Sequence, residues 1–83
     1  MLKLDFDSKY DILYIGIGDR KNSIGCEEYD GLIVLRDMDS NEITGITIMG
    51  FLRKLNSNKM PILPSDVNIS VDRDILPNMQ FFQ

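Results

Sequence analysis

Short apolar segments separated by turn residues are the feature that most constrains the fold of the first fifty residues. In the first segment Leu2, Leu4 and Phe6 occupy every second position, which is the period of a strand with one buried face. Similar segments, rich in β-branched and other apolar residues, follow at residues 12–17, 23–29, 32–35 and 43–49. This pattern predicts an antiparallel sheet of about five strands.

Turn-forming residues lie between all of these segments. They occupy residues 7–11, 18–22, 30–31 and 37–42. Asp, Ser and Asn side chains accept hydrogen bonds from nearby backbone N–H groups, and glycine adopts a positive φ without strain. Because each connection is short enough for a hairpin, we expect a meander, in which strand order in the sheet follows the chain.

A short helix is expected after the last of these strands. Phe51, Leu52 and Leu55 have the spacing of one helix face, and the helix is expected to begin near Gly50 and to end at residues 56–58. An apolar sheet face is not stable in water without a cover, and this helix supplies part of one.

Residues 56–83 read as an extension of this core. Val67, Ile69 and Val71 alternate with polar residues, which predicts a C-terminal strand, and a tail with Phe81 and Phe82 follows. The expected fold class is therefore α+β and mostly β. Residues 1–55 form a meander with one helix, and residues 56–83 pack on the same domain or on a dimer partner. The residues expected to make this packing contact are Val67, Ile69, Val71, Phe81 and Phe82. We expect a homodimer because a small domain gains core by pairing.

The composition argues against most catalytic chemistry. The chain has 83 residues, no histidine and one cysteine, so the commonest general base and the commonest zinc ligand are both missing. We expect no enzyme, no cofactor and no metal site. A single cysteine fits a reducing compartment, and no apolar run reaches the roughly 18 residues of a membrane span, so a cytoplasmic protein without a membrane partner is expected.

Charge is distributed unevenly along the chain. Residues 1–50 carry ten acidic and five basic side chains, and the formal net charge of the whole chain is −4. This balance disfavours nucleic acid. The acidic half could face a basic protein partner, but the charge by itself favours a solvated acidic surface that keeps a small protein soluble. The later basic residues Arg53, Lys54 and Lys59 have no aromatic residues between them, so they do not change the expectation against nucleic acid.

Three sequence blocks follow one another in the first 50 residues. The first is Phe6-Asp7, followed by Asp11 and then Leu13-Tyr14-Ile15, and the other two are residues 27–34 and 45–48. In this order the blocks resemble a widespread, uncharacterised family of small bacterial and phage domains. The resemblance covers roughly residues 2–55. Glu42 departs from it, since the family usually places glycine in that turn.

The resemblance implies a compact, β-rich domain. It carries no established activity, but members are often found beside small toxin-like proteins, which implies an antitoxin or partner role for some of them. Together with the acidic charge, this favours a non-enzymatic protein-binding module, antitoxin-like or a phage-encoded inhibitor. The expected partner-binding residues are Tyr14, Glu27, Glu28 and Tyr29, because tyrosine offers apolar area with a polar tip.

Two alternative functions remain open at this point. A metal-dependent hydrolase would use Asp5, Asp7 and Asp11, or the turn containing Asp37 and Asp39. The structural interpretation, which we favour, is that Asp7 and Asp11 accept backbone hydrogen bonds in the first turn. The other alternative is a protein that binds or sequesters a small ligand, for which the sequence offers no specific residue. Cys26 is expected to be a small core residue, because no histidine is available to activate it.

Overall fold

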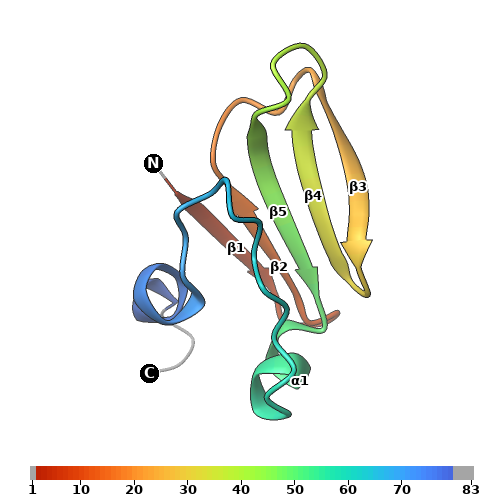
Figure 1. Ribbon diagram of the computed structural model, residues 1–83. Coiled ribbons are helices and arrows are strands. Elements are labelled where there is room, and N and C mark those ends of the chain that lie inside the picture. The colour runs from red at the N-terminus through yellow and green to blue at the C-terminus, as the bar shows by residue number, and fades with distance from the viewer. Residues whose placement is uncertain (1, 80–83) are drawn as a thin grey trace.

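Five antiparallel strands form one sheet in the computed structural model, which describes residues 2–79 (Figure 1). The strands are β1 (Lys3–Asp7), β2 (Ile12–Gly16), β3 (Ser23–Tyr29), β4 (Leu32–Asp37) and β5 (Ile43–Met49). A short helix, α1 (Phe51–Asn56), follows β5 as expected. The predicted number of strands and the predicted helix are therefore confirmed.

The order of the strands in the sheet is β1-β2-β5-β4-β3, so the predicted meander is wrong in one respect. The hairpins β1–β2, β3–β4 and β4–β5 are formed, but β2 pairs with β5 instead of β3. Residues 17–22 form no hairpin and connect β2 to the far edge of the sheet. On this path the backbone N–H groups of Ile17 and Gly18 donate to the carbonyl of Thr44 at 2.9 and 3.0 Å.

The character of β5 and β3 explains this order. The first four residues of β5, Ile43 to Ile46, are all buried, which requires neighbours on both sides and cover on both faces. Part of that cover comes from Arg20, whose Cδ lies 3.2 Å from the position that a Cβ would take at Gly45. In contrast, β3 contains a glycine and two acidic residues, which suits the edge of a sheet.

The core lies on one face of the sheet. Leu13, Ile15, Leu32, Val34, Ile46 and Ile48 on the three central strands are at most 1% exposed. Phe51 from α1 completes this layer, and its ring meets the ring of Phe6 edge to face, with the centroids 6.1 Å apart. The alternation of side chains with a period of two residues therefore determines which side chains of these strands are buried.

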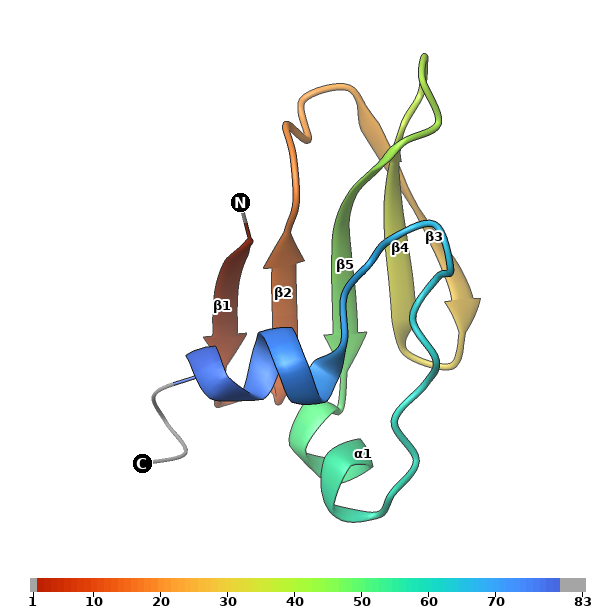
Figure 2. The ribbon, with the colours of Figure 1, turned by 60° about the vertical axis from the view of Figure 1, so that its left-hand side comes forward.

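The C-terminal segment covers the rest of this face, but the predicted strand over residues 67–71 is not formed. Residues 57–70 contain no helix or strand and cross the front of the sheet (Figure 2). A π-helical turn, Val71–Ile75, and a 3₁₀ turn, Leu76–Asn78, then lie in front of β1 and β2. The buried side chains of Ile75 and Met79 belong to the core.

Ser70 provides the physical reason for this change from strand to helix. Its hydroxyl accepts a hydrogen bond from the backbone N–H of Arg73 at 3.3 Å, and its own N–H donates to the carboxylate of Asp74 at 2.8 Å. This reciprocal arrangement resembles a capping box and begins a helix directly after residues 67–70. Val67, Ile69 and Val71 remain partly buried against the core, so their alternation reflects packing without strand pairing.

Candidate functional site

The outer edge of β3 is the most accessible regular element of the sheet. Among residues 2–79 the strand pairs only with β4, and every residue from Ile24 to Tyr29 is exposed. The side chains of Ile24 and Tyr29 are 62% and 61% exposed. A free strand edge offers a row of backbone donors and acceptors to another extended chain.

Cys26 lies in the middle of this edge, and the prediction that it is a core residue is wrong. The structure places it opposite Val34, which is buried, but Cys26 itself is exposed. Because β3 lies at the edge of the sheet, the segments that cover the core shield the neighbouring strand β4 but leave Cys26 exposed. The alternation of the sequence identified the correct face, and the position of the strand in the sheet determined the exposure.

Three of the four predicted partner-binding residues lie together, and the fourth lies apart from them. Glu27, Glu28 and Tyr29 form the end of β3, where the register with β4 shifts at a bulge. Tyr14 lies in the middle of β2, opposite Asp5 on one side, and two strands separate it from β3. Because its neighbours in the strand are buried in the core, Tyr14 faces the uncovered side of the sheet.

The two glutamates have different roles. The carboxylate of Glu27 accepts a hydrogen bond from the backbone N–H of Gly31 at 2.9 Å, which stabilises the turn between β3 and β4. Gly31 has a φ of 76°, as the Asp-Gly turn predicts. Glu28 is exposed. The hydrogen bond from Arg36 to Asp66 is the main cause of the raised pKa of Arg36, and the negative charges of Asp66 and Glu28 raise it further. Because its carboxylate makes no hydrogen bond within residues 2–79, Glu28 is the glutamate available to a partner.

The residues predicted to pack on the domain or on a dimer partner all belong to the C-terminal segment. Val67, Ile69 and Val71 pack against the core of their own chain. Phe81 and Phe82 lie outside the residues that the structure describes. The expected homodimer therefore stays a prediction.

Asp7 and Asp11 are both structural, as expected, but they act at different places. The Asp7 carboxylate accepts hydrogen bonds from the N–H groups of Lys9 and Tyr10 at 3.0 and 3.2 Å, within the β1–β2 turn. The Asp11 carboxylate instead accepts from Leu52 and Arg53 at 2.7 and 3.1 Å, at the start of α1. Sequence reasoning missed this contact because the partners are more than forty positions apart.

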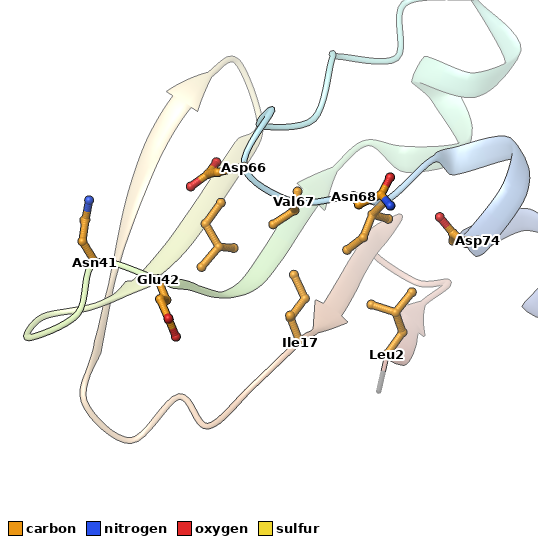
Figure 3. A pocket seen from close by; sticks show the side chains of 10 residues that line it. Leu2, Ile17, Asn41, Glu42, Asp66, Val67, Asn68 and Asp74 are labelled. Atoms are coloured by element: carbon orange, nitrogen blue, oxygen red, sulfur yellow. The ribbon is translucent and has the colours of Figure 1, made fainter.

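A hollow of about 700 Å³ lies between the C-terminal segment and the end of the sheet that carries Ile17 and the β4–β5 loop (Figure 3). Figure 3 shows Glu42 from the β4–β5 loop, Asp66 from the crossing segment and Asp74 from the π-helical turn around it. Arg36 donates to Asp66 at 3.0 Å, and Arg73 donates to Asp74 at 2.7 Å. These arginines are the main cause of the lowered pKa values of both carboxyl groups. Two of the three carboxylates therefore already have cationic partners.

A second hollow combines basic and apolar side chains, and sequence reasoning gave it no role. It lies beside α1 and is lined in part by Tyr29, Arg53, Lys54, Lys59 and Ile62. The three basic residues are close in sequence, so their cluster is visible there. Their proximity to Tyr29 follows only from the fold.

Residues 2–79 offer neither a metal-binding cluster nor a membrane-spanning helix. No group of three or more cysteine or carboxylate side chains in this part of the chain is placed to hold a metal ion. None of the helices formed by these residues has the length and apolar character needed to cross a bilayer.

Comparisons with known proteins add no relative. Neither protein-family models nor curated proteins nor solved structures gave a match to this chain.

Proposed function

We propose that this chain is a protein-binding module that pairs an extended segment of another protein with the outer edge of β3. The observation that carries this proposal is that the edge is long, regular and uncharged over most of its length. Residues 23–27 pair with β4 without interruption, and the exposed residues Ile24, Gly25 and Cys26 carry no charge. Edges without a partner are commonly protected by charged residues, proline or bulges, and here the bulge and the acidic pair lie only at the far end.

The charges at that end favour a basic partner. Glu28 and Asp30 are exposed beside the bulge, and Glu27 lies next to them. A partner strand with lysine or arginine near its corresponding end would complement these carboxylates and associate faster for it. This arrangement supports an antitoxin-like or inhibitory role toward a basic protein, which acts by occupying a strand-binding surface.

Affinity capture with paired variants tests the proposal. In the edge variant Ile24→Lys/Cys26→Lys, two lysines protect the strand in the way that natural edges are protected. The control variant Tyr10→Lys/Met38→Lys adds the same charge at two other exposed side chains. We expect the wild type and the control to capture one protein at equal stoichiometry from the cells that make the chain, and the edge variant to capture at least tenfold less. The absence of a stoichiometric partner, or equal capture by the edge variant, would contradict the proposal.

A further inference from the structure

The hollow beside α1 concentrates positive charge in an otherwise acidic protein. Its volume is about 630 Å³, and Arg53, Lys54 and Lys59 line it together with a single acidic residue, Asp30. The formal charge of these four side chains is therefore +2, whereas the net charge of the whole chain is −4. Such a local excess of one sign attracts ligands of the opposite sign.

Internal ion pairs do not account for these cations. Within residues 2–79 the salt bridges are Arg36–Asp66 and Arg73–Asp74, and neither involves a residue of the hollow. Basic residues in the last turn of a helix often bind its free carbonyls. Here those of Arg53, Lys54 and Leu55 already accept from the backbone N–H groups of Ser57, Lys59 and Asn58. The Arg53 and Lys59 side chains are therefore available.

Lys54 makes the hollow a preformed structure. Its ammonium donates to the carbonyls of Asp30 and Met49 at 2.8 and 2.7 Å, which ties α1 to the β3–β4 turn and to the end of β5. The ammonium lies over Gly31, where a Cβ would collide with it. An ammonium has three N–H groups, so one remains for a ligand.

Apolar side chains form the other part of the lining. Ile62 is 86% exposed and Tyr29 is 61% exposed, and both line the hollow. Small-molecule sites typically combine apolar walls with a few polar groups that fix orientation. The phenol of Tyr29 adds a further hydrogen-bond donor.

We propose that this hollow binds a small organic oxyanion. Its phosphate or carboxylate group is held by Arg53, Lys59 and the free N–H of Lys54, and its apolar part lies on Tyr29 and Ile62. A guanidinium presents paired N–H groups that match two oxygens of a phosphate or carboxylate, and it loses no charge at any accessible pH. This site adjoins the end of β3 through Tyr29, but it does not include the uncharged edge residues Ile24, Gly25 and Cys26.

Titration of the full chain at constant ionic strength, followed by amide chemical shifts, tests the site. The probes are phenyl phosphate, benzoate and inorganic phosphate. We expect saturable shifts at Tyr29, Arg53 and Lys59 with at least one of the two aromatic probes, and weaker binding of inorganic phosphate because it lacks an apolar part. Tighter binding of phenyl phosphate identifies a phosphate ligand, and tighter binding of benzoate identifies a carboxylate ligand.

Charge-matched variants separate a built site from general attraction. Arg53→Gln/Lys59→Gln removes two charges from the exposed cations of the hollow, and Lys9→Gln/Lys21→Gln removes two exposed charges elsewhere. We expect the first variant to weaken binding at least tenfold and the second less than twofold. The absence of saturable shifts with both aromatic probes, or equal weakening by both variants, would overturn the proposal.

Discussion

Asp11 supplies an unusual cap for α1, because one residue distant in sequence satisfies four backbone donors. Its carbonyl accepts from the N–H groups of Gly50 and Phe51 at 2.7 and 3.0 Å, and its carboxylate accepts from Leu52 and Arg53. The N-cap residue itself, Gly50, has no side chain to do so. The first N–H groups of a helix lack partners within it, so Asp11 performs the role of a cap and joins the β1–β2 hairpin to the helix.

Replacing Asp11 should therefore destabilise the protein through two separable effects. Asp11 has a φ of 56°, which glycine adopts without strain. Asp11→Gly should lose the carboxylate alone and lower the free energy of unfolding by about 1–2 kcal/mol. Asp11→Ala should lose about 1 kcal/mol more because of the left-handed backbone. Urea unfolding measures both values, with Asp5→Ala as the control at an exposed aspartate. Equal stability of all three variants would show that the cap contributes nothing.

At the scale of elements, the C-terminal segment is part of the core and not an appendage. Ile75 in the π-helical turn is 0% exposed, and Met79 is 5% exposed. Both belong to the same cluster as the central strands. Residues 57–79 therefore cover apolar side chains on one face of the sheet, and α1 covers those at its end.

Ile75→Ala should be one of the costly substitutions in the chain. Removing a fully buried isoleucine side chain costs about 2–5 kcal/mol, and Ile75→Val should cost about 0.5–1.5 kcal/mol. The control Ile62→Ala changes a side chain that is 86% exposed and should stay within about 0.5 kcal/mol. Denaturant midpoints of the three variants provide the comparison. A loss below about 0.5 kcal/mol for Ile75→Ala would mean that the segment is not anchored.

The connections illustrate how far local chemistry determines an element. The Asp-Gly turn at residues 30–31 and the polar turn at 37–42 were predicted as hairpins and are hairpins. Residues 18–22 have equally good turn residues, and Asp19 does accept from the N–H of Lys21 at 3.0 Å. The local turn is real, but it does not bring β2 and β3 together. Turn chemistry alone therefore does not predict which strands pair.

At the scale of the whole molecule, three carboxyl groups with lowered pKa values make stability depend on pH. The N–H groups of Ser40 and Asp39 lower the pKa of Asp37, Arg36 lowers that of Asp66, and Arg73 lowers that of Asp74. A carboxyl group with a lower pKa in the folded state binds protons more readily in the unfolded state. Its contribution is therefore complete above the ordinary aspartate pKa and is lost as pH falls through the lowered value.

We therefore expect the unfolding midpoint in urea to be nearly constant from about pH 8 to 5 and to fall below about pH 4. Asp37→Asn retains an oxygen that accepts from the turn N–H groups but cannot be protonated in this range. Its decline in acid should be shallower than that of the wild type, and Asp5→Asn should leave the decline unchanged. The same acid decline in Asp37→Asn and the wild type would show that Asp37 does not contribute.

Local patterns in the sequence are enough to predict the five strands of the sheet, three of the four predicted hairpins, the helix after Gly50 and the face of each strand that points toward the core. These follow from alternation, helix spacing and turn residues, which act over a few neighbouring positions. Contacts between distant segments establish that β2 pairs with β5, that Asp11 caps a helix 41 positions away, that Cys26 is exposed, and that Tyr29 lines the same hollow as Arg53 and Lys54. These contacts depend on competition among strand edges and covering segments that are distant in the chain, and local residue preferences do not resolve that competition.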